Sequence, residues 1–184
     1  MASNTRREAT VQDLYGIPEN RKAEIVRGEL LPMSPTGALP GRVASQIYFS
    51  LRSYERQTGN GYAIPDNVGI LVDLPNRRSF SPDAAFHRGP LSGKFLEGAP
   101  LFAAEVRSDG DYGPIAERAM ADKRADYFAA GTLVVWDVDV LQDVTVRAFR
   151  ASDPERPTTY RRGERAAAKP ALPGWSMPVD DLLA

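Results

Sequence analysis

The chain has 184 residues, a net charge of −1, 42% hydrophobic and 26% charged residues, as expected of a globular protein with a sizeable core. It has no cysteine, which excludes disulfides and thiolate chemistry, and its one histidine excludes a zinc site built from several histidines. The near-neutral charge gives no global signal for nucleic acid, so a basic groove would have to be local. No apolar run reaches membrane-spanning length and the N-terminus lacks a signal-peptide core, so we expect a cytoplasmic protein without membrane contact.

The N-terminal third predicts, in chain order, a loose polar segment, a short helix, a β-hairpin, a loop and a long amphipathic helix. These cover residues 1–9, 11–15, 22–33, 34–41 and 42–58. Thr10 can cap the short helix, and Arg27-Gly28 suits the turn of the hairpin. The loop is predicted from its proline and glycine content, and the long helix from apolar residues recurring at helical spacing.

The next segment predicts short strands and connections. Strands are expected over 62–64 and 68–72, followed by a tight connection at 76–78. A further strand opens with Pro82-Asp83, where proline fixes the start, and ends at His87, which we expect to be exposed. A loop rich in glycine and proline follows over 89–100.

Residues 101–139 predict a strand, a turn, a helix and a second strand. Pro114 suits the first turn of the helix and Gly131 its C-cap, while 101–106 and 133–136 are short apolar runs. A strand–helix–strand unit of this length implies a crossover and a sheet with a parallel component. We therefore expect an α/β fold with a mixed sheet.

The C-terminal part predicts a strand over 144–149, a turn over 152–157 and a short strand over 158–160. Residues 161–169 are charged and expected to be mobile, and a short helix is expected over 179–183. There is no internal repeat and no sign of a second domain, so the chain is expected to form one domain over 1–184.

Two charges interrupt the apolar pattern. Glu105 lies within a run that should be buried, and Lys123 falls in the apolar arc of the following helix. A buried ion pair and a functional site explain these charges equally well. Asp83 favours the second explanation if its strand neighbours that of Glu105, because two carboxylates in one pocket repel unless a divalent cation holds them. A lysine beside such a site fits phosphodiester hydrolysis, and the lack of histidines favours Mg²⁺ or Mn²⁺.

These residues resemble the core of PD-(D/E)XK nucleases, with Pro82-Asp83, then Glu105-Val106-Arg107, and with the lysine moved from the strand to the helix at Lys123. The chain more closely resembles the Uma2 family of endonucleases, the DUF820 group. The resemblance follows family order over most of the chain, through residues 24–30, 33–35, 81–83, 105–106, 123–131 and 135–139.

The resemblance implies a restriction-endonuclease-like core, with a central mixed sheet flanked by helices, and hydrolysis of DNA. Asp83 and Glu105 would bind one Mg²⁺ together with a backbone carbonyl near Val106, and Lys123 would orient a water or stabilise the transition state. Glu24 becomes an auxiliary metal or water ligand, with a solvated glutamate on an edge strand as the alternative. Family resemblance also implies a homo-oligomer.

Arg107 departs from the superfamily pattern, which has lysine at that position. It should share a face of the strand with Glu105, and its high pKa makes it a poor proton acceptor, so we assign it to transition-state or phosphate binding. Arg77 and Arg78 precede the Pro82-Asp83 strand and are further candidates for phosphate contact.

Two other functions compete with the metal-dependent DNA endonuclease. One is a binding or scaffold protein that keeps the nuclease fold without activity, which the neutral charge favours and the intact set of Asp83, Glu105 and Lys123 disfavours. The other is a hydrolase or metal-binding protein that acts on a different phosphate substrate, because a fold does not fix a function.

Overall fold

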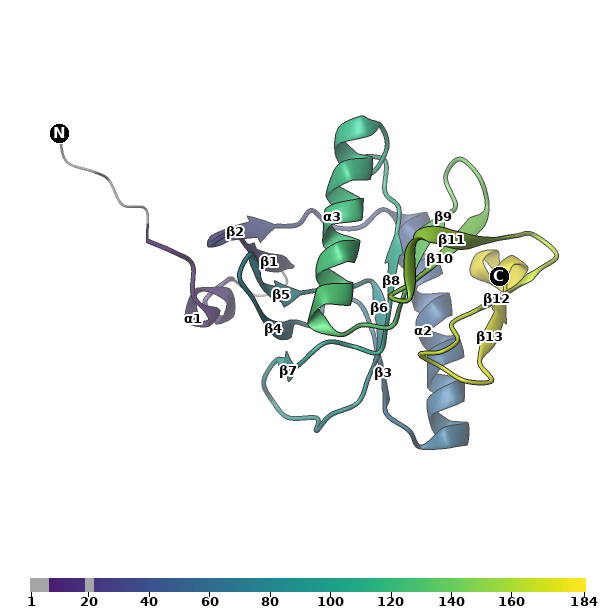
Figure 1. Cartoon of the computed structure of the whole chain (residues 1–184), viewed down its shortest axis with the longest axis horizontal. Coiled ribbons are helices and arrows are strands. Elements are labelled where there is room, and N and C mark those ends of the chain that lie inside the picture. The colour runs from purple at the N-terminus through teal and green to yellow at the C-terminus, as the bar shows by residue number, and fades with distance from the viewer. Residues whose placement is uncertain (1–6, 19–21) are drawn as a thin grey trace.

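A computed structural model of the chain describes residues 7–18 and 22–184, so the loose segment expected over 1–9 lies largely outside the described residues. Within these residues, two large sheets, a small two-stranded sheet and the helices α1, α2 and α3 make up the architecture (Figure 1). Within the described ranges, none of the helices is long and apolar enough to cross a membrane.

The larger sheet has six strands and contains the predicted strand–helix–strand unit. In order across the sheet they are β11 (Asp153–Arg161), β10 (Thr145–Arg150), β9 (Val134–Asp139), β8 (Phe102–Val106), β6 (Ala84–His87) and β3 (Tyr62–Ile64). β8 and β9 are parallel, and the other neighbouring pairs are antiparallel. Helix α3 (Pro114–Ala130) joins the parallel pair and ends at Gly131, whose φ of 113° explains the glycine there. The predicted mixed sheet is therefore confirmed.

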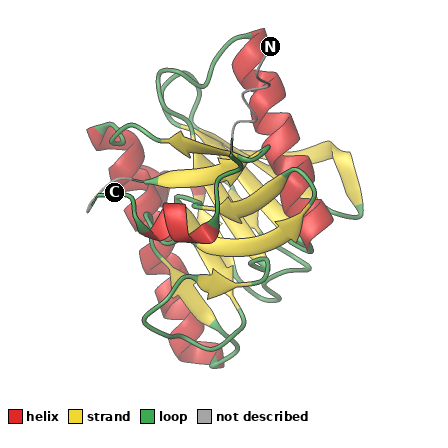
Figure 2. Cartoon of the chain, turned by 90° about the vertical axis from the view of Figure 1, so that its left-hand side faces the viewer, coloured by secondary structure: helices red, strands yellow, loops and turns green. Residues whose placement is uncertain are grey.

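Helix α2 (Ala38–Thr58) lies behind the large sheet in Figure 1, and α3 lies in front of it. Figure 2 shows the strands between the helices from the side. On the α2 face, the core is formed mainly by aliphatic and aromatic side chains, including Val43, Ile47, Leu51, Phe102, Trp136 and Trp175. On the α3 face, Tyr127 stacks on Phe80 with ring centroids 3.9 Å apart. The central strands are consequently covered on both faces, which makes any charge on them costly.

The smaller of the two large sheets has five strands. Its order is β2 (Glu29–Pro32), β1 (Ala23–Val26), β5 (Arg77–Phe80), β4 (Ile70–Leu74) and β7 (Leu96–Glu97). The predicted hairpin is confirmed as β1–β2, with positive φ at both Arg27 (50°) and Gly28 (74°), as a tight two-residue turn requires. The predicted short helix is α1 (Val11–Tyr15), capped by Thr10, whose hydroxyl oxygen accepts from the Asp13 amide.

Three of the sequence expectations for the N-terminal half are wrong. Helix α2 begins at Ala38 rather than residue 42, because Pro40 lies in its first turn, where the missing amide hydrogen costs no helical bond. Of the connection expected at 76–78, only Asn76 lies in the turn, and Arg77 and Arg78 already belong to strand β5. His87 is buried, with 1% of its surface exposed, because Tyr62 of β3 pairs beside it.

The C-terminal expectations need two corrections. The predicted strand over 158–160 is part of β11, which is longer and pairs with β10 along most of its length. The segment expected to be mobile contains β12 (Arg165–Ala167), which pairs with β13 (Ser176–Pro178) and buries Ala166 and Met177. The terminal helix is confirmed as the 3₁₀ helix η1 (Val179–Leu183).

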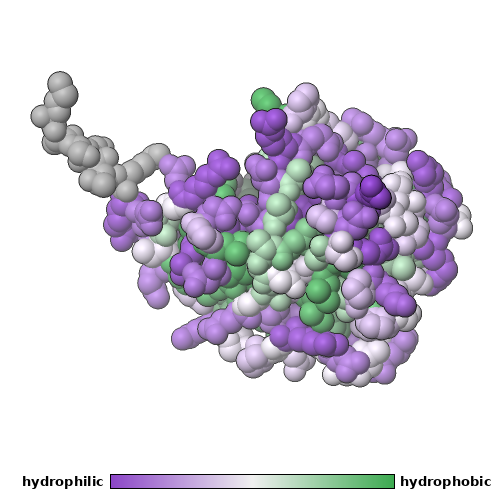
Figure 3. Space-filling view, viewed as in Figure 1, coloured by the Kyte–Doolittle hydropathy of each residue, from purple (hydrophilic) through white to green (hydrophobic). Residues whose placement is uncertain are grey.

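The apolar arc of α3 predicted that this side of the helix packs against the sheet, and only the second half of the helix does so. Tyr127 is fully buried, whereas Ile115 is 88% exposed. The first turns of the helix border a cleft and do not pack against the sheet. Figure 3 shows a strip of weakly hydrophobic residues along α3 on an otherwise mostly hydrophilic face. The exposed half of α3 therefore forms one wall of the candidate site.

Candidate active site

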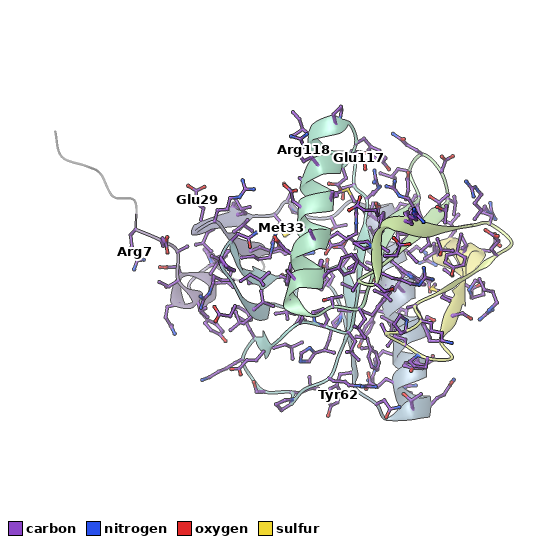
Figure 4. All side chains as sticks on the ribbon, in the orientation of Figure 1. Arg7, Glu29, Met33, Tyr62, Glu117 and Arg118 are labelled. Atoms are coloured by element: carbon purple, nitrogen blue, oxygen red, sulfur yellow. The ribbon has the colours of Figure 1, made fainter. Side chains whose placement is uncertain are left out.

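A cleft of about 1110 Å³ lies between α3, the β1–β2 hairpin, the start of α2 and the ends of β8 and β9. Met33 lies beside α3 on the hairpin side, and Glu117 lies towards the N-terminal end of that helix (Figure 4). Of the predicted site residues, the cleft is lined by Glu24, Arg77, Asp83, Glu105, Val106 and Lys123. The chain thus brings together residues that are up to a hundred positions apart in sequence.

Asp83 is fixed against the end of β8. Its amide donates to the Ala104 carbonyl at 3.1 Å, and its Oδ2 accepts a 2.8 Å hydrogen bond from the Val106 amide. This exchange continues the antiparallel pairing of β6 with β8 by one more residue. The carboxylate is therefore held one strand away from Glu105, as the sequence argument requires.

Glu105 accepts hydrogen bonds on both carboxylate oxygens. Lys123 donates to Oε2 at 2.8 Å, and the hydroxyl of Tyr127 donates to Oε1 at 2.7 Å. Burial raises the pKa of Glu105, Lys123 lowers it, and the nearby Asp83 and Glu24 carboxylates raise it again, so that it lies above its usual value. Burial lowers the pKa of Lys123, but Glu105 and Glu24 outweigh that effect and keep the ammonium charged.

Glu24 is a buried member of the site, so the alternative of a solvated edge-strand glutamate is wrong. Its strand β1 lies between β2 and β5, and only 5% of the residue is exposed. Its carboxylate contacts Lys123 at 3.0 Å and Arg77 at 2.6 Å, and it accepts from the Ser81 amide at 2.9 Å. Glu24 consequently gives Lys123 a second carboxylate partner beside Glu105.

Lys22 is a site residue that the sequence analysis missed. Its ammonium donates to Asp83 Oδ1 at 2.9 Å and to Asp66 Oδ1 at 2.7 Å, and its side chain is 10% exposed. Burial lowers the pKa of Lys22, but Asp83 and the neighbouring carboxylates outweigh it. The available signal was its spacing from Glu24, because residues two apart in an extended segment point to the same side.

Arg107 lies on the same face of the sheet as Glu105, but its guanidinium has no donor free for a phosphate. Its Nε and Nη2 donate to the two oxygens of Asp137 at 2.7 and 2.9 Å. The remaining donors bond Glu117 and the Asp111 carbonyl. These five hydrogen bonds use the five donors of an arginine, so the structure does not support the phosphate-binding role expected for Arg107.

Arg77 and Arg78 are equally unsuited to the phosphate contacts expected of them. Arg77 is buried, and its guanidinium bonds Glu24 at 2.6 Å and Asp126 at 2.8 Å. Arg78 points away from the cleft, because consecutive residues of β5 face opposite sides, and it pairs with the exposed Asp73 at 2.8 Å. Both arginines have structural partners instead.

The metal-binding potential of the cleft depends on two carboxylates. Among residues 7–18 and 22–184, no group of three or more histidine, cysteine or acidic side chains is arranged to hold a metal ion. Asp83 and Glu105 nevertheless offer the hard oxygen ligands that Mg²⁺ and Mn²⁺ prefer. Burial raises the pKa of Glu105 and the nearby Asp83 and Glu24 carboxylates raise it further, and a divalent cation would favour the charged form of Glu105. The donor set therefore fits such an ion, provided that Lys22 leaves Asp83.

A mixed sheet with a helical crossover, and with Asp83, Glu105 and Lys123 gathered at the end of the parallel pair, defines a restriction-endonuclease-like fold. A crystal structure described as a putative nuclease belonging to DUF820, from Anabaena variabilis, has this fold with a TM-score of 0.74 and 16% sequence identity. The match covers 95% of this chain and 97% of that one. At this identity the likeness concerns the fold alone.

The family assignment comes from the sequence match. The Uma2 family, described as "Putative restriction endonuclease", matches residues 9–180. The chain therefore belongs to the Uma2 family, which confirms the resemblance seen in its motifs. No match was found among curated proteins.

Proposed function

We propose that this protein is a metal-dependent endonuclease that hydrolyses DNA phosphodiester bonds in the cleft beside α3. The observation that carries the proposal is the meeting of Asp83, directly before β6, with Glu105 of the adjacent strand β8, and with Lys123 bonded to Glu105 at 2.8 Å. Membership of the Uma2 family supports a nuclease, and so does the shared fold with a DUF820 protein described as a nuclease.

Asp83 and Glu105 would hold one Mg²⁺ or Mn²⁺, together with the backbone carbonyl of Val106. When bound, such an ion polarises a phosphate oxygen and lowers the pKa of a water. The Val106 amide already orients Asp83, and the Tyr127 hydroxyl already orients Glu105, so both carboxylates are positioned before an ion arrives.

Lys123 would stabilise the negative charge that develops on the phosphate during the reaction. Its ammonium lies between Glu105 at 2.8 Å and Glu24 at 3.0 Å and stays protonated, so it is not a proton acceptor. A fixed positive charge in a partly dry cleft is most effective where charge appears only in the transition state. Glu24 acts as a positioning residue for Lys123, since it contacts the lysine and is itself held by Arg77.

One specific observation favours the alternative, a nuclease-fold protein without catalytic activity. Each oxygen of Asp83 and Glu105 already accepts a hydrogen bond, from Lys22, Val106, Lys123 or Tyr127. The network is complete without an ion and would suffice as a structural ion-pair cluster. Metal binding therefore separates the two functions.

The test is calorimetric titration of Mg²⁺ and Mn²⁺ into the wild type, Asp83→Asn and Asp73→Asn. Asp73 is the matched control, because it is a carboxylate with an 87% exposed side chain on β4, outside the cleft. We expect binding by the wild type and Asp73→Asn, and none by Asp83→Asn. Asp83→Ala and Glu105→Ala should likewise abolish cleavage of plasmid DNA in Mg²⁺.

Each of the other possible results of the titration argues against one part of the proposal. If the wild type binds neither ion, the metal-dependent reaction is refuted and the inactive scaffold replaces it. If the wild type binds Mg²⁺ at Asp83 but leaves supercoiled, linear and single-stranded DNA intact, the substrate is a different phosphate compound. Equal binding by all three proteins would place the ion somewhere other than the proposed carboxylates.

A further inference from the structure

The cations that line the cleft differ in whether they are already paired. Within the described residues there are four: Lys22, Arg77, Lys123 and Arg124. The first three form salt bridges with carboxylates at 2.6 to 3.0 Å. The guanidinium of Arg124 has no hydrogen bond or ion pair within that part of the chain, although the residue follows Lys123 directly on α3. It is therefore the cleft cation without a carboxylate partner.

An aromatic ring fixes the guanidinium of Arg124 in place. Its central carbon lies 3.6 Å from the ring centroid of Phe149 on β10, which is the distance of a stacked pair. Stacking uses the face of the guanidinium and leaves its N–H groups, which lie in the plane, directed outward. The arginine is thus ordered without losing its capacity for a bidentate contact.

None of the neighbouring carboxylates forms a hydrogen bond or ion pair with Arg124 within the described residues. Asp137 accepts from Arg107 and also from Arg147 at 2.6 Å, and Glu117 accepts from Arg107, so both are occupied by other arginines. The exposed Glu155 raises the pKa of Arg124 but does not bond it. Burial lowers the pKa of Arg124, Asp137 raises it and Arg147 lowers it, as expected for a desolvated cation without its own counter-ion.

The cleft consequently holds a cluster of paired charges and one unpaired cation. Glu24, Asp83 and Glu105 bond the cations Lys22, Arg77 and Lys123, whereas Arg124 keeps an unpaired positive charge beside them on α3. A phosphodiester strand needs a metal cation at Asp83 and Glu105, and it finds an unpaired cation already in place at Arg124. We propose that Arg124, held on Phe149, binds a backbone phosphate next to the scissile one. This inference rests on the proposed endonuclease function and identifies a substrate contact within the same cleft.

The experiment compares wild type, Arg124→Gln, Arg124→Lys and Arg118→Gln in binding a fluorescent DNA duplex. Arg118 is the matched control, an exposed arginine on the same helix outside the residues that line the cleft. Anisotropy is measured in Ca²⁺ over a range of salt concentrations, and cleavage is measured separately in Mg²⁺. Loss of one charged hydrogen-bonded contact should weaken binding roughly 10- to 100-fold.

Three further readouts distinguish a phosphate contact from a merely structural arginine. The slope of log affinity against log salt should fall by about 0.7–0.9 for one lost phosphate contact. Arg124→Gln should raise KM with kcat little changed, as expected when uniform binding is removed. Arg124→Lys keeps the charge and should restore part of the affinity, while Arg118→Gln should behave as the wild type.

The failures of this inference and of the proposed function are distinguishable. If folded Arg124→Gln binds DNA with wild-type affinity and salt slope, Arg124 is not the contact, whereas the endonuclease stands. If the wild type itself neither binds nor cuts DNA, the proposed function fails and this inference fails with it. Should Arg124→Gln not fold, Phe149→Leu removes the stacking surface and keeps the arginine. A folded Phe149→Leu protein with unchanged affinity would also overturn the inference.

Discussion

Lys123 of α3 donates a 2.8 Å hydrogen bond to Glu105 of β8, so an ion pair joins the crossover helix to the strand that precedes it. Glu24 contacts the same ammonium at 3.0 Å from the other sheet. One lysine thus connects three parts of the fold and sits among more negative than positive charge. We therefore expect a substitution of Lys123 to affect the rate of DNA cleavage and the packing of these three parts of the fold to different extents.

Replacing Lys123 by methionine should lower the rate of Mg²⁺-dependent DNA cleavage about 100-fold or more, because the cleft loses its fixed positive charge. Metal binding should persist, since Asp83 and Glu105 remain. The measurement is single-turnover cleavage beside a calorimetric Mg²⁺ titration. Lys94→Met, on an exposed loop, is the control. Full activity in Lys123→Met would show that the lysine serves structure alone.

Arg77→Leu should lower the free energy of unfolding by about 3–5 kcal/mol, because it removes the arginine partner of two mostly buried carboxylates. Arg77 bonds Glu24 and Asp126, and all three side chains are mostly buried. Arg78→Leu, at the next position, removes an exposed pair with Asp73 and should change stability by less than about 1 kcal/mol. Urea unfolding of both variants measures the difference, and equal losses would contradict the structural role of Arg77.

The same arginines show where the sequence was informative and where it was not. Glu105 and Lys123 were found because each breaks an apolar pattern, which a single sequence displays. Arg77 was assigned to a turn because its burial depends on Glu24 and Asp126, which lie 53 and 49 positions away. No local pattern carries such partners. Burial of a charged residue can thus be predicted only where its neighbours in sequence are apolar.

The helices, the mixed sheet and the meeting of Asp83 with Glu105 followed from local patterns and the family resemblance. Lys22 did not, because its partners Asp66 and Asp83 belong to other elements. Arg124 was also missed, since a charge on a helix normally indicates a solvated face. Its stacking on Phe149 depends on the way in which α3 crosses β10.

Tyr127→Phe should lower the free energy of unfolding by about 1–3 kcal/mol, because Glu105 loses a buried hydrogen-bond donor while the aromatic stack on Phe80 remains. Catalysis should fall as well, since one oxygen of Glu105 is no longer oriented. Thermal unfolding and cleavage kinetics are the measurements. Tyr62→Phe, on edge strand β3 and partly exposed, is the control. An unchanged stability and rate would mean that the hydroxyl does not position Glu105.

His87 should make the stability of the fold sensitive to acid. It is 1% exposed, neither ring nitrogen has a hydrogen-bond partner within the described residues, and burial lowers its pKa. The folded protein therefore binds this proton less readily than the unfolded chain, in which the pKa is about 6.5. The stability contributed by neutral His87 should be complete above that pH and be lost below it, by at most about 1.4 kcal/mol per pH unit.

The comparison of wild type with His87→Leu isolates this contribution from that of the carboxylates, which both proteins share. Leucine removes the titrating group and leaves no unpaired polar atom, so its stability at pH 7 should be equal or higher. Urea unfolding between pH 8 and pH 5 should show a steeper loss in the wild type below about pH 6.5. Parallel curves for the two proteins over that range would mean that the unfolded and folded states bind the His87 proton equally well, and that burial does not disfavour the imidazolium.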